Sequence, residues 1–189
     1  MNVFKLIKSD LLRYRATGAS SSLKVIFFNQ GFIFTSIFRI NSALYYKCKR
    51  VPLLNKLVGL HCLIWLKISQ VITGLSLPIG LKVGKGIFIS HSGTIIINSN
   101  CELGENCNLA PDTVIGFGIK NGIRGYPKIG NRVFIGPGAK IFGPIVIGDD
   151  VAVGANAVIN SSVPDKAVVV GIPGKVVSFN GSSDYIQFY

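Results

Sequence analysis

The feature that most constrains this chain is an aliphatic residue that returns every six positions from residue 77 onward. An antiparallel sheet would alternate with a period of two, and an amphipathic helix with a period of 3.6. The six-residue period predicts a parallel β-helix, in which each hexad supplies one short strand and one corner. Glycine often follows the aliphatic residue, and a second small or apolar residue lies four positions after it. The aliphatic positions are Leu77, Val83, Ile89, Ile97, Leu103, Leu109, Ile115, Ile129, Ile135, Ile141, Ile147, Val153 and Ile159.

The repeat is broken at two places. Between Ile89 and Ile97 the spacing is eight residues, and this stretch contains His91, one of only two histidines in the chain. Between Ile115 and Ile129 the chain inserts "GFGIKNGIRGYPK". Extra residues in a stacked coil are extruded sideways, where binding residues usually lie. We therefore expect two functional loops. His91 is either a reagent in one of them or a packed structural residue.

The positive charge is concentrated before the repeat. Residues 1–76 hold eleven lysines and arginines and one acid, a net charge of +10, whereas the rest of the chain carries +2. Residues 1–73 are expected to be helical, with a helix that begins at Pro52. They form either a cap on the β-helix or a patch that lies on an anionic membrane. No uninterrupted apolar span of about 20 residues is evident, and no nucleic-acid-binding module is visible.

The remaining candidates for chemistry have simpler explanations. The four cysteines form no CxxC pair and match no zinc spacing, so we expect free thiols in a reducing compartment and no metal. Cys101 and Cys107 are expected to be small buried residues. His61 lies in an apolar helix and is expected to have no catalytic role. The predicted organisation is a helical region at 1–73, a β-helix domain at 74–178 and a tail at 179–189.

Three segments together resemble a known family. They are the "GIFISHSGT" loop, the insertion before "YPKIG", and the closing "VVGIPGKVV". This stretch, about residues 74–178, resembles the hexapeptide-repeat acyltransferases. The closest resemblance is to serine acetyltransferases and to the acetyltransferases of capsule and exopolysaccharide clusters. The resemblance implies a left-handed β-helix, a homotrimer and acetyl-CoA as co-substrate. It also implies that His91 is the general base, with direct attack in a ternary complex.

The acceptor is predicted from departures from that family. Ser76 and Ser90 stand where serine acetyltransferases carry acids, and "RGYPKI" replaces their "DRHPKI". These departures favour a saccharide hydroxyl over an amino acid. The acceptor would be a cell-surface polysaccharide or its precursor, including a lipid-linked one. The alternatives are a serine acetyltransferase and a non-catalytic trimerising scaffold. The predicted acceptor contacts are Ser76, Ser90, Asn121 and Tyr126.

Acetyl-CoA in this family lies in a groove between two subunits, along coil edges that carry small residues. The matching positions in this chain are Gly116, Phe117, Gly136, Pro137, Ala155 and Lys175. Lys175 would meet a phosphate of the cofactor, although a solvated lysine on the last coil explains it nearly as well. The expected location is the cytoplasm, including the inner face of the bacterial plasma membrane.

Overall fold

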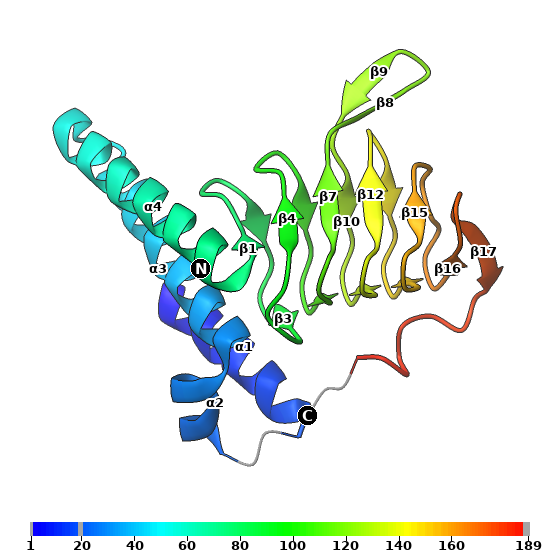
Figure 1. The fold of residues 1–189 in the computed structure, drawn as a ribbon, viewed down its shortest axis with the longest axis horizontal. Coiled ribbons are helices and arrows are strands. Elements are labelled where there is room, and N and C mark those ends of the chain that lie inside the picture. The colour runs from blue at the N-terminus through cyan, green and yellow to red at the C-terminus, as the bar shows by residue number, and fades with distance from the viewer. Residues whose placement is uncertain (1, 19–20, 187–189) are drawn as a thin grey trace.

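The computed structural model describes residues 2–18 and 21–186, and it shows four helices followed by a stack of short strands (Figure 1). Asn2, Ser21 and Asn29 begin three helices, and each accepts a hydrogen bond from an N–H group of the first turn. The fourth helix begins at Pro52, as the sequence predicts, and ends at Gly74 with a φ of 74°. The helices are α1 (Val3–Ala16), α2 (Ser22–Phe28), α3 (Gln30–Cys48) and α4 (Pro52–Thr73).

The short strands form three parallel sheets, the three faces of one continuous coil. Face 1 consists of β1 (Leu75–Ser76), β4 (Ile95–Ile97), β7 (Val114–Gly116), β12 (Lys140–Phe142) and β15 (Val158–Ile159). Face 2 consists of β2 (Lys82–Val83), β5 (Glu102–Leu103), β10 (Lys128–Ile129) and β13 (Val146–Ile147). Face 3 consists of β3 (Phe88–Ile89), β6 (Asn108–Leu109), β11 (Phe134–Ile135), β14 (Ala152–Val153), β16 (Val168–Val170) and the antiparallel β17 (Lys175–Ser178).

The turns between faces fall into three columns, because each coil bends at the same places. The histidine corner links face 3 to face 1 through residues 90–94, 110–113, 136–139 and 154–157. The hairpin corner links face 1 to face 2 through residues 98–101, 117–127 and 143–145. The ladder corner links face 2 to face 3 through residues 104–107, 130–133 and 148–151. Both predicted loops lie in these columns, one at the histidine corner and one at the hairpin corner.

The coil interior is filled by the residues of the hexad pattern. Twelve of the thirteen aliphatic positions are buried, and Val83 is partly buried against the same core. The second position of the hexad also points inward, since Cys107, Thr113, Val133 and Ala157 are all at most 1% exposed. Burial of each aliphatic side chain is worth about 1.5–3 kcal/mol. The aliphatic residues that recur every six positions are therefore the residues that fill the core.

Glycines at the ladder corner are required by the close approach of successive coils. A Cβ atom on Gly84 would lie 2.5 Å from the backbone of Gly104, and one on Gly104 would lie 2.4 Å from the carbonyl oxygen of Gly130. Neither glycine has a positive φ. In later coils the left-handed conformation at this corner is adopted by polar residues, such as Arg132 with a φ of 54° and Asp150 with a φ of 58°.

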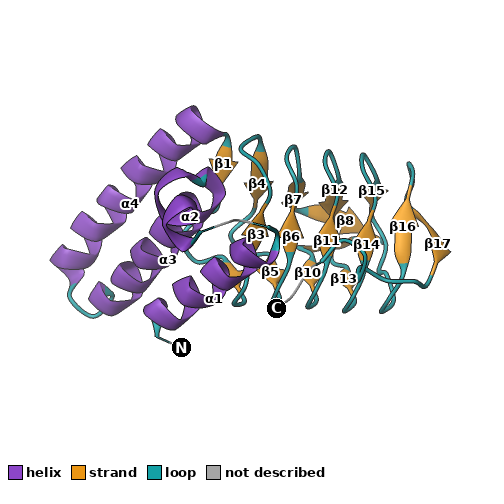
Figure 2. Ribbon diagram, turned by 90° about the horizontal axis from the view of Figure 1, so that it is seen from below, coloured by secondary structure: helices purple, strands orange, loops and turns teal. Residues whose placement is uncertain are grey.

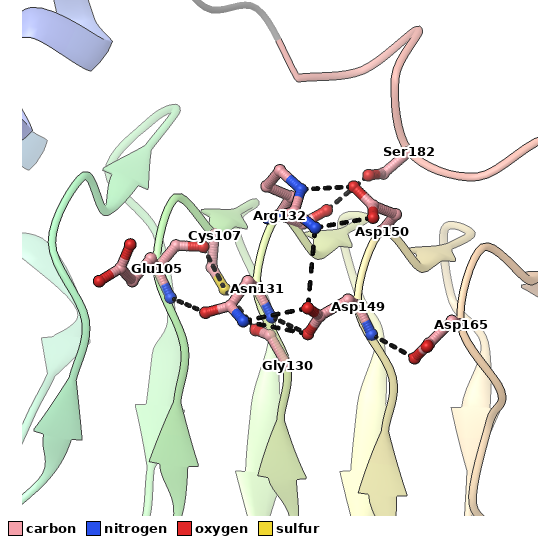
Figure 3. A network of polar contacts seen from close by, with 9 residues as sticks. All are labelled: Glu105, Cys107, Gly130, Asn131, Arg132, Asp149, Asp150, Asp165 and Ser182. Carbon is pink, nitrogen blue, oxygen red and sulfur yellow. Dashed lines mark hydrogen bonds and ion pairs between the residues drawn. The ribbon is translucent and has the colours of Figure 1, made fainter.

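Side chains at the ladder corner also bond one coil to the next (Figure 3). The Asn131 side chain accepts the N–H of Glu105 at 2.8 Å, and Asp149 accepts the N–H of Asn131 at 2.7 Å. Asp165 continues the series by accepting the N–H of Asp149 at 2.8 Å. These bonds use backbone N–H groups that the narrow turns leave unpaired. The ladder therefore fixes the stacking of four coils.

The helices cap the open end of the coil. Strand β2 is an edge of face 2, so its outer backbone groups lack a strand partner. Arg39 of α3 donates to the Val83 carbonyl at 2.7 Å and to the Gly84 carbonyl at 2.5 Å. Asp10 of α1 pairs with Arg39 at 3.1 Å and accepts the N–H of Ile87 at 3.0 Å. The buried Arg39–Asp10 pair thus bonds to backbone groups at the end of the coil that have no neighbouring strand.

Two further residues of α1 close the edge of face 3. The Tyr14 hydroxyl accepts the N–H of Ile89 at 3.0 Å and donates to the carbonyl of the same residue at 3.2 Å. Arg13 donates to the Asn108 side chain at 2.6 Å. Tyr14 also packs its ring on Phe88, with centroids 4.7 Å apart. The cap, one of the two alternatives for residues 1–73, is present, and it depends on buried charged and polar groups of α1 and α3.

Helix α4 extends away from the first coil and packs against α3 (Figures 1 and 2). By length and composition alone it is apolar enough to cross a membrane, contrary to the expectation that no such segment exists. Only 17% of its most apolar 18-residue window is buried. A helix at the core of a soluble domain buries its apolar residues, so α4 carries an unusual amount of apolar surface that the rest of its own chain leaves uncovered.

Candidate active site

His91 lies immediately after the buried strand β3, in the first turn of the histidine corner, and its side chain is exposed. The turn is fixed on both sides of it. The Ser90 N–H donates to the Leu109 carbonyl at 3.2 Å, and the Gly93 N–H donates to the Thr73 carbonyl at 3.1 Å. The Ser92 hydroxyl also bonds to the side chain of Gln30. The backbone around His91 is therefore held, while the imidazole faces outward.

The imidazole has no hydrogen-bond partner in the part of one chain that the structure describes. Ser76, which is predicted to contact the acceptor, does not reach it. The Ser76 hydroxyl is buried on β1 and accepts a hydrogen bond from the Gln70 side chain at 2.7 Å. Ser76 is thus bonded to α4. No hydrogen bond within the described part of one chain orients the His91 ring.

Small residues follow His91 down the histidine corner. Strands β3, β6, β11 and β14 stack in this order on face 3, so the turns after them stack in the same order. Gly138 N–H donates to the Pro111 carbonyl at 2.9 Å, and Asn156 N–H donates to the Pro137 carbonyl at 2.8 Å. Pro137 and Ala155 are exposed at this edge, and Lys175 is exposed on β17 beyond the last turn. The predicted cofactor contacts Gly136, Pro137 and Ala155 therefore share one edge with His91.

The other predicted contacts lie at the hairpin corner. Strands β8 (Gly118–Lys120) and β9 (Ile123–Gly125) form an antiparallel hairpin that projects from the body of the coil (Figure 1). Asn121 and Gly122 form its tip with φ values of 50° and 78°. The sequence predicts only a loop here, although an Asn-Gly pair between two apolar runs is the usual signal for such a turn.

Aromatic rings mark the base of the hairpin. Phe117 and Tyr126 pack edge to face with their centroids 5.7 Å apart. Gly116 precedes them, and a Cβ atom on it would meet nothing within 4 Å. The space beside Gly116 is therefore open, whereas Gly84 and Gly104 at the ladder corner lie directly against the next coil.

The predicted site residues are not all brought together within one chain. His91, Pro137 and Ala155 lie along the histidine corner, whereas Phe117, Asn121 and Tyr126 lie along the hairpin corner. The two corners are opposite edges of face 1. Ser76 lies between them on face 1 and is covered by α4.

Comparisons with known proteins identify the family. The sequence model of the bacterial transferase hexapeptide family (six repeats) matches residues 126–161. A serine acetyltransferase of Synechococcus elongatus is 30% identical over 181 residues, which cover 95% of this chain and 70% of that protein. This chain belongs to the serine acetyltransferase family. The matches to two other curated serine acetyltransferases span about half of those proteins, 48% of one and 54% of the other.

Solved structures agree with the family assignment. The serine acetyltransferase of Neisseria gonorrhoeae superposes with a TM-score of 0.80 at 26% identity, covering 94% of this chain and 68% of that one. The serine acetyltransferase of Brucella abortus in complex with coenzyme A gives a TM-score of 0.80 at 22% identity, with the same coverage, and shows the fold. The coil is the left-handed parallel β-helix of the serine acetyltransferase family, as the sequence predicts.

The prediction of a saccharide acceptor is wrong. The relatives and the solved neighbours are serine acetyltransferases, and the 30% identity extends over 95% of the chain, including the helices. The prediction rested on a few replacements, such as Ser76 for an acid and Tyr126 for a histidine. Single replacements show which contacts have changed, but they do not place the chain outside a family that it matches over nearly its whole length.

A cavity beside the His91 turn was missed by the sequence analysis. It has a volume of about 240 Å³ and is lined by residues that include Ser90, Ala110 and Tyr185. The Tyr185 ring stacks on Phe134 with centroids 4.6 Å apart, and the Asn108 side chain donates to the Tyr185 carbonyl at 3.1 Å. The tail at residues 179–186 thus lies over face 3 of the chain's own coil. No spacing in residues 179–186 signals this contact.

The cysteines are unsuited to nucleophilic or metal chemistry. All four are buried free thiols. Burial raises the pKa of Cys101 and of Cys107 to about 11, so neither is a thiolate near neutral pH. No group of three or more metal-ligating side chains occurs among residues 2–18 and 21–186. His61 is exposed on α4, far along the chain from both corners.

Proposed function

We propose that this protein is an acetyl-CoA-dependent serine O-acetyltransferase that acts in the cytoplasm as a homotrimer. The observation that carries the proposal is the match to a serine acetyltransferase over 181 residues, through both the helical cap and the β-helix. The close superposition on a second serine acetyltransferase supports it. The exposed His91 at a fixed turn supplies a group suited to the chemistry.

His91 is the proposed general base. A serine hydroxyl is a weak nucleophile, and a neutral imidazole can take its proton as the oxygen attacks. The oxygen forms a bond to the carbonyl carbon of the acetyl thioester, and the carbon–sulfur bond then breaks. The departing sulfur receives the proton from the imidazolium, which gives O-acetylserine and free coenzyme A. This direct transfer needs both substrates bound together, and it leaves no acetyl group on the enzyme.

The histidine corner is the proposed acetyl-CoA site. Its exposed edge carries Pro137 and Ala155 in line with His91, so an extended chain can lie along it with the thioester near the imidazole. Gly136 keeps this edge flat, because a Cβ atom there would lie 2.8 Å from the Val153 carbonyl oxygen. Lys175, beyond the last turn, is placed to meet a phosphate at the far end. A Brucella abortus relative with this fold binds coenzyme A.

The acceptor requires a cation for its carboxylate. Lys120 and Arg124 of the hairpin are both exposed. Arg124 pairs across the hairpin with Ile119, and Lys120 pairs with Ile123, so the two cations lie on opposite faces of the ribbon. Arg124 lies two residues before Tyr126, at the side of the aromatic pair. We assign the serine carboxylate to Arg124, with Tyr126 beside it.

The two halves of the site come from two copies of the chain. His91 and Arg124 of one chain lie at opposite edges of face 1. Each interface of a cyclic trimer joins two different patches of the chain, and we assign these patches to the histidine corner of one subunit and the hairpin corner of the next. The projecting hairpin then reaches over the neighbouring His91, and Ser90 and Asn121 lie at the rim of the same cleft.

The decisive experiment measures thiol release from acetyl-CoA with L-serine as acceptor. We expect wild-type turnover, and we expect His91→Ala to lower kcat by about 10²–10⁴-fold, the usual contribution of a general base. His61→Ala is the matched control, because it removes the other exposed histidine and should leave kcat unchanged. Equal activity of His91→Ala and wild type would remove His91 from the mechanism. Acetylation of other hydroxyl compounds without acetylation of serine would overturn the proposed acceptor.

A further inference from the structure

Helix α4 carries an apolar stripe that points away from the rest of the protein. The buried residues Val58, Cys62 and Ser69 form the inner side of the helix, which packs on α3 and the first coil. The opposite side has apolar residues at spacings of three and four, which places them on one face. We call them the outer stripe of α4: Leu53, Leu57, Leu60, Ile64, Ile68 and Val71, with exposed fractions of 44–87%.

The outer stripe continues into a groove between α3 and α4. The groove has a volume of about 190 Å³, and its lining includes Ile33, Trp65, Ile68 and Ile72. Ile68 belongs to both the stripe and the groove, and Ile72 is 75% exposed at the groove's edge. The apolar surface is therefore continuous along the length of α4, and isolated exposed side chains do not account for it.

The surface around the stripe is basic and has no exposed acid. Residues 2–18 and 21–73 contain eleven lysines and arginines and one carboxylate, Asp10. Asp10 is fully buried in its pair with Arg39. Lys56 and Lys67 are exposed beside the stripe on α4. Three further cations, Lys47, Lys49 and Arg50, are exposed at the turn between α3 and α4. An apolar surface bordered only by cations fits a partner that is both apolar and anionic.

We propose that the outer stripe of α4 docks on the surface of a membrane that contains anionic lipids. The leucine and isoleucine side chains would enter the boundary between headgroups and acyl chains, and the lysines would reach the headgroup phosphates. Each cation near such a surface strengthens binding by about fivefold. The docking is independent of which acceptor is acetylated.

Other arrangements fit the charges less well. Two copies of the stripe packed on each other would bring two basic surfaces together with no exposed acid on the helices to compensate. Nucleic acid would meet the lysines but leave the leucines without a partner. A membrane-spanning α4 would have to leave α3, and it would place Lys56 and Lys67 in hydrocarbon. A helix that lies in the plane of the interface satisfies both the apolar residues and the cations.

The test uses the full chain and sedimented vesicles of phosphatidylcholine alone or of phosphatidylcholine mixed with the anionic lipid phosphatidylglycerol. We expect binding only to the anionic vesicles. Leu57→Ser with Leu60→Ser should weaken it at least tenfold. Lys47→Ser with Lys49→Ser and Arg50→Ser should weaken it at least as much. Val146→Ser with Val177→Ser is the control, because these exposed valines lie on the β-helix, and it should bind like wild type.

Two results would overturn the proposal. One is no binding of the wild-type chain to anionic vesicles at low salt. The other is vesicle binding that is unaffected by the Leu57 and Leu60 changes, accompanied by a smaller assembly of that variant in sedimentation velocity. That second result would assign the stripe to a contact between copies of the chain. Thermal melting of each variant shows that it is folded, so that a loss of binding reports on the surface.

Discussion

At the scale of single residues, the proposed serine site uses a cation, Arg124, that the family motif does not place at this position. Arg124 is the exposed guanidinium on the Tyr126 side of the hairpin. A bidentate, charge-assisted hydrogen bond from a guanidinium to a carboxylate is worth about 1.5–3 kcal/mol. We therefore expect Arg124→Ala to raise KM for serine by about 10–100-fold and to change kcat much less. Initial rates at varied serine and saturating acetyl-CoA measure both constants.

The matched control for Arg124 is Lys120→Ala. It removes one positive charge from the opposite face of the same hairpin, so it tests whether general charge attraction explains the effect. An unchanged KM in this variant would show that position matters. If both variants raised KM equally, the hairpin would attract serine only through its net charge, and the assignment of the carboxylate to Arg124 would fail.

The sequence located His91 but not the contacts around it. The eight-residue spacing between Ile89 and Ile97 marked an irregular turn, because a change in period shows where residues leave the stack. The partner of a side chain is set by the three-dimensional path of the chain, and no spacing encodes it. Thus Ser76, a predicted acceptor contact, bonds instead to Gln70. No spacing shows that Arg39 is buried with Asp10, 29 residues away in the chain.

At the scale of structural elements, the ladder corner makes the stability of the coil depend on pH. Hydrogen bonds from Asn131 hold the pKa of Asp149 below its usual value, and the Arg132 side chain does the same for Asp150. A carboxyl group with a lowered pKa stabilises the fold above its unfolded pKa, near 3.9. The stabilisation is lost as the pH falls through the lower folded value. We therefore expect the melting temperature to fall as the pH drops below about 4.

Asp149→Asn isolates the contribution of one carboxylate to this fall. The amide oxygen can still accept the Asn131 N–H, but it does not titrate, so the variant should lose less stability between pH 5 and pH 3 than wild type. Asp184→Asn is the control, because Asp184 is exposed in the tail and has no hydrogen bond or ion pair in the described part of the chain. Identical pH profiles for Asp149→Asn and wild type would refute the role of Asp149.

Helices and strands could be predicted where the sequence shows a repeating period or a helix-start residue. A contact that occurs at only one place in the fold could not. The hexads predicted the faces, and Pro52 predicted the start of α4. The Asn121-Gly122 turn was readable in principle, since it separates two short apolar runs, but the insertion was treated as a loop. The return of the tail over face 3, with Tyr185 on Phe134, follows no pattern. It depends on a contact between residues 51 positions apart.

At the scale of the whole molecule, the three corners have different roles. The ladder corner holds the coils in register, the histidine corner carries His91 and a smooth edge, and the hairpin corner projects beyond the coil. The helices close one end, and the outer stripe of α4 is the proposed membrane contact. Because the proposed base His91 and the proposed carboxylate ligand Arg124 occupy two edges of face 1, a single chain would hold two half-sites and no complete one. Activity should therefore require assembly.

Mixing two defective variants tests this arrangement directly. His91→Ala and Arg124→Ala are each expected to be nearly inactive when serine is far below KM. If they are unfolded and refolded together in equal amounts, a site formed by the His91 of one subunit and the Arg124 of the next is intact in about a quarter of random interfaces. We expect about a quarter of wild-type activity in the mixture, measured by thiol release. The same variants refolded separately and then combined provide the control and should stay inactive. If His91 and Arg124 of one chain served the same site, every site in the mixture would carry one defect, and refolding them together would restore nothing.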